Sequence, residues 1–148
     1  MMNQKAYYIS TATGILEEST ALLTRLQTTL DYIVTTLQEA EKNQDEEELK
    51  STYTSTGQKY LPVFEGLFKD VFRLRSRIAP LTPYRKYRHS QQYLLESVDC
   101  LNKSIQMQKD AVKKMADGDI EGAKKELLDT RPLIGQGRKA MKRFSSSI

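Results

Sequence analysis

The chain has 148 residues, of which 39% are hydrophobic and 28% are charged, and its formal net charge is +4 at pH 7. This length suits a single domain that needs no disulfide, and the single cysteine excludes an intramolecular one, while few prolines and glycines favour helix over strand. Because no apolar run approaches the roughly 18 residues that span a bilayer and the N-terminal residues lack signal-peptide features, we expect a cytoplasmic protein without a transmembrane segment.

A leucine repeat marks the first predicted helix. Leucines recur at every seventh position from Leu16 to Leu37, which predicts one long helix over about residues 4–43. A DNA-binding zipper needs a strongly basic helix before its first leucine, and only Lys5 precedes this one, so we interpret the repeat as core of a bundle. A homodimer through a spare face of this helix is an open alternative, and that face would consist of Tyr8, Ile15 and Leu22.

An acidic run opens the second predicted helix. Asp45 is followed by three glutamates, and carboxylates stabilise helix N-termini, so we expect a helix over about residues 45–79. Pro62 lies inside the apolar pattern and cannot donate a backbone hydrogen bond, which predicts a kink or a short break near it. Pro80 and Pro83 then end the helix, because each restricts the preceding residue to extended geometry.

Two further helices are predicted over about residues 84–116 and 119–143. The segment between them contains Gly118, which can adopt the left-handed conformation of a helix C-terminus, and Asp119, which can cap the next helix. Pro132 is expected to interrupt the last helix. Short connections between amphipathic helices indicate antiparallel neighbours.

These four helices predict an all-α fold, an antiparallel up-and-down four-helix bundle that occupies residues 1–148 as one domain. The second half of the chain also resembles a known group of domains. The run PYRKYRHSQQYLLESVDCLNKSIQM, followed by KMADGDIEGAKKELL, is similar to the second half of uncharacterised small helical-bundle domains of Gram-positive bacteria, some of which carry a lipoprotein anchor. This chain has no lipobox cysteine. The resemblance implies a helical fold and carries over no functional residues.

Basic residues cluster in two stretches of the chain. Seven lie from Lys69 to Arg88 against one acid, and five lie from Arg131 onward with no acid. In an up-and-down bundle, the connection between the second and third helices lies at the same end as both termini, so we expect the two stretches to meet at one basic end. The acidic run that begins at Asp45 would lie at the opposite end.

The basic end is the candidate site for an anionic partner. We expect it to dock an acidic partner protein, and sequence-independent nucleic-acid binding by the same residues is the alternative. The tyrosines of PYRKYRH can stack on bases or add contact area, but they can equally close the end of the core. The candidate binding residues are Arg73, Arg77, Tyr84, Arg85, Lys86, Tyr87, Arg88, Arg138 and Lys139.

The residue counts argue against catalysis and metal binding. The only histidine, His89, and the only cysteine, Cys100, would lie about 16 Å apart along one helix, too far to act as nucleophile and base. The usual zinc and di-iron sites need more histidine and cysteine than the chain has. The segment DGDIEGAKKELL begins like a calcium loop, but Leu128 replaces the required final glutamate. We therefore expect a protein that is not an enzyme and binds no metal or cofactor.

Overall fold

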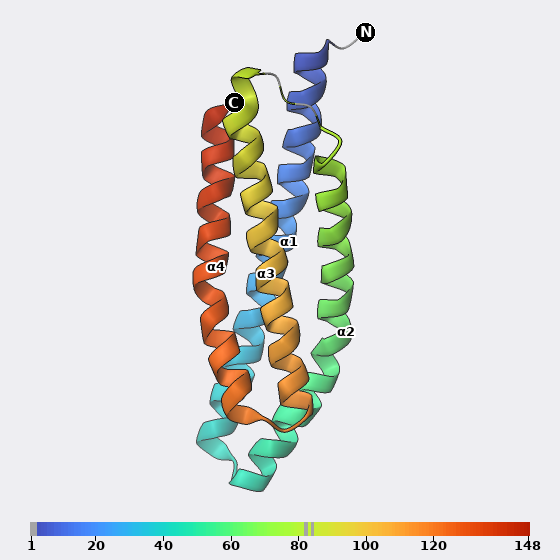
Figure 1. Ribbon diagram of the computed structural model, residues 1–148. Helices are drawn as coiled ribbons and strands as arrows, with labels where there is room; N and C mark the ends of the chain where they lie inside the picture. Colours follow the sequence, from blue (N-terminus) through green and yellow to red (C-terminus); the bar gives the residue numbers. More distant parts are fainter. Residues whose placement is uncertain (1–2, 82, 84) are drawn as a thin grey trace.

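The computed structural model describes residues 3–81, 83 and 85–148, and within them the chain forms an antiparallel up-and-down bundle of four α-helices (Figure 1). The predicted all-α four-helix bundle is therefore confirmed. None of the helices described is both long enough and apolar enough to cross a membrane. The elements are α1 (Gln4–Asn43), α2 (Glu46–Ile78), the 3-10 turn η1 (Arg85–Tyr87), α3 (Arg88–Ala116) and α4 (Ile120–Ser147).

Helix α3 is the centre of the packing. Figure 1 shows α3 between α4 and α2, with α1 behind it, and α3 packs against all three other helices. The start of α1, the end of α4 and the α2–α3 connection lie together at one end, called here the upper end; the α1–α2 and α3–α4 turns lie at the lower end. Since α2 and α4 flank α3 on opposite sides, their outer surfaces face away from each other.

The core row of α1 changes register near Ser19. Along this helix the spacing between successive buried residues alternates between three and four. The exception is at Ser19, which lies four residues after Ile15 and four residues before Leu23. Such an inserted step rotates the apolar row around the helix, which explains why Leu16 is only half-buried although it belongs to the leucine repeat. The buried row is Tyr8, Ala12, Ile15, Ser19, Leu23, Leu26, Leu30, Ile33, Leu37 and Ala40.

The face of α1 that was predicted to be free for a homodimer is packed against the core. Tyr8 and Ile15 are 1% and 0% exposed and belong to the core, and Leu22 is half-buried against it. The prediction that these three residues form a free face of the first helix is therefore wrong. A strict seven-residue repeat based on the leucines places them outside the core, because it does not allow for the two successive four-residue spacings at Ser19.

Both helical prolines lie on solvent-facing positions. The predicted break at Pro62 does not occur, because α2 is continuous through it, although Figure 1 shows the lower part of α2 inclined to its upper part, as expected for a kink. Helix α4 likewise continues through Pro132, so the predicted interruption is wrong. Residues four positions before each proline, Gln58 and Leu128, are exposed, so the carbonyl groups left without a donor face solvent.

The last helix is also longer than predicted. It runs to Ser147 instead of ending near residue 143, because its final turns are packed. Phe144 is fully buried, and the Ser147 hydroxyl donates to the hydroxyl of Ser90 on α3 at 2.7 Å. The third helix begins later than predicted, at Arg88, since residues 85–87 form a 3-10 turn that ends on a buried tyrosine.

The α3–α4 turn follows the predicted capping pattern. Gly118 has φ 83°, a left-handed conformation that glycine adopts without strain. Its N–H donates to the Met115 carbonyl at 3.0 Å, and the Asp119 N–H donates to the Lys114 carbonyl at 2.8 Å, which is the Schellman arrangement. The Asp119 carboxylate then accepts from the N–H of Gly122 at 3.0 Å and caps α4.

Two buried tyrosines predict a loss of stability at alkaline pH. Tyr8 donates to the Gln91 side chain at 2.7 Å and Tyr53 donates to the Glu41 carboxylate at 2.9 Å. Burial raises the pKa of Tyr8 to about 12, and burial followed by the hydrogen bond to Glu41 raises the pKa of Tyr53. The pKa of the Tyr8 hydroxyl in the folded protein thus lies above the unfolded value of about 10, which means that folding favours the protonated hydroxyl. The stability that this hydroxyl contributes is complete below pH about 10 and is lost as pH rises through about 12.

Urea unfolding at pH about 9 and about 11 measures this loss. The Tyr8→Phe variant removes one ionisable hydroxyl, so its free energy of unfolding should fall less between the two pH values than that of the wild type. An equal fall in both proteins would contradict the assignment of alkaline sensitivity to Tyr8.

Candidate functional site

The arginines of α2 are paired with acids on α1, α3 and α2 itself. Exposed pairs of this kind stabilise a protein by about 1 kcal/mol or less, but each carboxylate cancels much of the positive field of its arginine. Two of these arginines, Arg73 and Arg77, were predicted to bind an anionic partner. The pairs, with their closest N–O distances, are Arg77–Glu18 (2.5 Å), Arg75–Asp99 (3.6 Å) and Arg73–Asp70 (3.7 Å).

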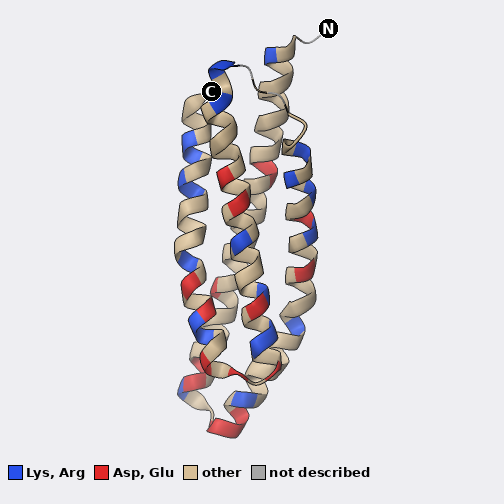
Figure 2. Cartoon of the chain, viewed as in Figure 1, with Lys and Arg blue, Asp and Glu red and all other residues tan. Residues whose placement is uncertain are grey.

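A second set of cations has no such partners. These residues lie in η1, at the start of α3 and in the upper half of α4; all are exposed, and none forms an ion pair with a residue that the structure describes. The stretches that carry them, residues 85–95 and 131–148, contain no Asp or Glu. Figure 2 shows Lys and Arg along the upper half of α4 and at the top of α3. We call this set the cationic surface: Arg85, Lys86, Arg88, Arg138, Lys139, Lys142 and Arg143.

Packing between α3 and α4 holds the two parts of the cationic surface on one side of the molecule. The Ser90–Ser147 hydrogen bond joins the first turn of α3 to the last turn of α4. On α4, Arg138 and Lys142 are four residues apart, as are Lys139 and Arg143, so they form two neighbouring rows on the solvent face. Arg138 also donates to the side-chain oxygen of Gln27 on α1, which steadies its guanidinium.

The structure brings together only part of the predicted site. Arg85, Lys86 and Arg88 lie at the upper end, whereas Arg138 and Lys139 lie lower, about 13 Å along the axis from the last turn of α4. Both groups lie on the side of α3 and α4, and the α2 arginines belong to the other side of α3. Tyr84 lies outside the described residues. Lys142 and Arg143 were part of the basic stretch but not of the predicted site, and their helical spacing from Arg138 and Lys139 would have indicated them.

Tyr87 does not offer contact area to a partner. Its side chain is 4% exposed and stacks on Tyr8, with ring centroids 5.9 Å apart. The Lys86 ammonium lies 5.6 Å from the centre of the Tyr87 ring, where the cation and the ring attract each other. The Tyr87 ring is therefore not available as contact area for a partner, because it closes the upper end of the core.

The lower end carries both signs of charge. The acids around the two lower turns alternate with lysines (Figure 2), and two of them form ion pairs, Glu126 with Lys114 and Glu41 with Lys124 at 2.6 Å. The hydrogen bond from Lys124 lowers the pKa of Glu41. The four consecutive carboxylates from Asp45 to Glu48 form no ion pair with a described residue, so this end keeps an excess of negative charge, opposite in sign to the cationic surface.

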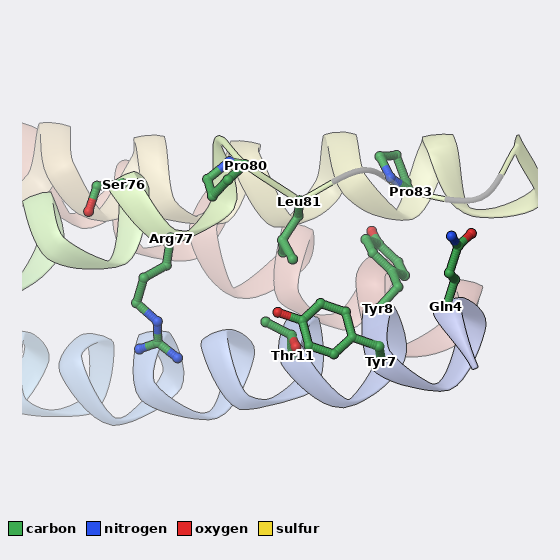
Figure 3. A pocket seen from close by; sticks show the side chains of 9 residues that line it. All are labelled: Gln4, Tyr7, Tyr8, Thr11, Ser76, Arg77, Pro80, Leu81 and Pro83. Carbon is green, nitrogen blue, oxygen red and sulfur yellow. The ribbon is translucent and has the colours of Figure 1, made fainter. Parts of the chain in front are cut away.

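A cleft opens beside the upper end, between the first turns of α1 and the end of α2 with the connection that follows it (Figure 3). Its volume is about 770 Å³. Tyr7, which is 59% exposed, and Leu81 contribute apolar walls, and Arg77 contributes the one charged side chain among the described lining residues. This cleft was not predicted from the sequence. The only hint was Tyr7, an aromatic residue directly beside the core row.

The remaining reactive residues offer no further site. Burial raises the pKa of the Cys100 thiol, so the reactive thiolate is disfavoured, and the side chain packs between α3 and α4 as a small apolar group. His89 is exposed at the start of α3, next to Arg88. In the part of the chain that the structure describes, no group of three or more His, Cys, Asp or Glu side chains is placed to hold a metal ion.

No family model matches the chain, and neither a curated protein nor a solved structure matches it. The resemblance of the second half to small bacterial helical-bundle domains thus stays a prediction. The charge, shape and burial of the surface are the observations that bear on function.

Proposed function

We propose that this protein is a non-enzymatic binding protein that docks an acidic partner protein through the cationic surface. One observation carries this proposal: the seven cations lie on the side of α3 and α4 without acidic partners in the described chain, while the arginines of α2 are each paired. Like charges that share a surface repel one another, and an anionic partner relieves that repulsion as it binds. Such a field also steers the approach of an acidic partner and raises its association rate.

The burial of Tyr87 favours a protein partner over nucleic acid. Proteins that bind single strands without sequence preference combine cations with exposed aromatic side chains on which bases stack. In the two stretches that carry the cationic surface, the Tyr87 ring is covered by Tyr8 and Lys86, and Phe144 is fully buried. The third aromatic side chain of these stretches, Tyr93, is half-buried. The surface therefore offers charge and hydrogen-bond donors, which suit carboxylates.

Charge reversal on α4 tests the proposal. The probes are a fluorescent glutamate-rich peptide and a fluorescent DNA duplex of similar length, each titrated with protein over a series of salt concentrations. The Lys142→Glu/Arg143→Glu variant should bind the peptide about tenfold more weakly than the wild type, because two attractions become repulsions. The matched control, Arg73→Glu/Arg75→Glu, changes the net charge equally on the opposite side of the bundle and should bind almost as tightly as the wild type.

The salt series separates the two classes of partner. Tighter binding of the duplex than of the peptide, with a steep linear fall of log affinity against log salt, would replace the protein partner by nucleic acid. Absence of peptide binding even at low salt, or an equal loss in both double variants, would show that the cationic surface is not a docking site.

A further inference from the structure

The cleft beside the upper end has the size of a small-molecule site. Sites for small ligands commonly enclose about 300–1,000 Å³ and combine apolar walls with a few polar groups, and this cleft has about 770 Å³. It follows α1 from Gln4 to Thr11, a distance of about 10 Å along the helix axis. The cleft therefore extends along α1, which suits an elongated ligand.

The middle of the cleft is apolar. In Figure 3 the side chains of Tyr7 and Leu81 point toward one another from α1 and from the α2–α3 connection, and Pro80 and Pro83 lie on the same side as Leu81. Tyr7 remains 59% exposed although its neighbour Tyr8 is 1% exposed. The chain thus leaves an aromatic ring uncovered inside a concavity, where an apolar ligand would remove it from water.

One end of the cleft carries a positive charge. Figure 3 shows Arg77 at the end opposite Gln4, reaching from α2 toward α1. One of its terminal nitrogens donates to Glu18 at 2.5 Å, and its side chain is 46% exposed. A guanidinium has five N–H donors in a planar fork, so Arg77 can bind a second carboxylate through donors that Glu18 does not use.

We propose that this cleft binds a linear amphipathic carboxylate, with its hydrocarbon chain between Tyr7 and Leu81 and its carboxylate on Arg77. Burial of the methylene groups removes apolar surface from water, so the hydrocarbon chain supplies most of the affinity and the ion pair fixes the direction in which the ligand lies. Glu18 competes for the same guanidinium and limits the affinity. Arg77, which would hold the carboxylate, is not one of the residues of the cationic surface.

Calorimetric titration with decanoate, below its micelle-forming concentration, tests the proposal. We expect the Arg77→Met variant to bind decanoate about tenfold or more weakly than the wild type, because a charge-assisted hydrogen bond is lost. Arg75→Met is the matched control: its arginine is two residues away but pairs with Asp99 of α3, so binding should not change. Glu18→Gln should bind several-fold more tightly, since it removes the competing carboxylate.

Comparison of head groups completes the test. Decanol, which has the same chain without the charge, should bind the wild type more weakly than decanoate and should bind Arg77→Met as tightly as it binds the wild type. Tyr7→Ala should weaken both ligands. The proposal is overturned if decanoate does not bind, if it binds Arg77→Met as tightly as the wild type, or if decyltrimethylammonium binds the wild type as tightly as decanoate. Tyr7, Glu18 and Arg77 are all exposed, so these variants should retain the fold.

Discussion

Replacement of Gly57 by alanine is expected to lower the free energy of unfolding by about 3 kcal/mol. A Cβ atom at this position would lie 2.4 Å from the backbone nitrogen of Ala116 and 2.5 Å from the carbonyl oxygen of Val112. Both are main-chain atoms of α3, so no side-chain rotation relieves the overlap, and α2 and α3 would have to separate. Glycine lies in the middle of α2 because the two backbones approach closely there.

Gly66→Ala is the matched control, since it makes the same change in the same helix. Apart from its chain neighbours and the backbone of its own helix turn, no atom lies within 4 Å of a Cβ at Gly66. Only helix propensity therefore acts, and alanine should raise the free energy of unfolding by about 1 kcal/mol. Urea unfolding of the wild type and both variants measures the two changes. A similar shift of the same sign in both variants would contradict the close approach at Gly57.

Replacement of Gln108 by methionine is expected to raise the free energy of unfolding by about 1–3 kcal/mol. Gln108 is fully buried on α3, and neither its amide nitrogen nor its amide oxygen forms a hydrogen bond with the described chain. A buried amide that has lost its hydrogen bonds to water destabilises the folded state. Methionine has nearly the same shape and length without the polar atoms, so it should fill the same space.

The same substitution at Gln91 should have the opposite effect. The Gln91 oxygen accepts from the Tyr8 hydroxyl at 2.7 Å, and its nitrogen donates to the Ile78 carbonyl at 3.4 Å. Gln91→Met would leave the buried Tyr8 hydroxyl without its acceptor and should lower the free energy of unfolding by about 1 kcal/mol or more. Thermal or urea unfolding compares the two variants, and a loss of stability in Gln108→Met would show that its amide is satisfied in the folded protein.

The helices and their caps could be predicted from the sequence because both depend on local spacing. The apolar period and the acidic run at Asp45 place α1 and α2 nearly as observed, and the Asp45 side chain does accept from the N–H of Glu48, at 2.8 Å. Gly118 and Asp119 lie in the predicted conformations, since a tight turn restricts which residues it accepts. Proline was misleading at residue 132, because its effect depends on whether the freed carbonyl meets solvent, which the sequence alone does not reveal.

The candidate site was less predictable because pairing between charges depends on tertiary structure. Arg77 and Arg85 look alike in the sequence, but Arg77 pairs with Glu18, 59 residues earlier, whereas Arg85 has no acid beside it among the described residues. The burial of Tyr87 likewise depends on Tyr8 at the other end of the chain. A count of charges along the chain therefore locates a basic region and cannot select the cations that remain free to bind.

The two lower turns also divide the bundle into two hairpins of equal loop-closure entropy. The Tyr53–Glu41 contact between α2 and α1 and the Lys114–Glu126 contact between α3 and α4 each close a loop of 12 residues, whereas the Tyr8–Gln91 contact between the hairpins closes one of 83 residues. On the logarithmic dependence of closure entropy on length, the contact between the hairpins costs about 2 kcal/mol more than closure of either hairpin. The two hairpins are thus the parts of this topology with the lowest entropic barrier to assembly, and their docking adds the most distant contacts.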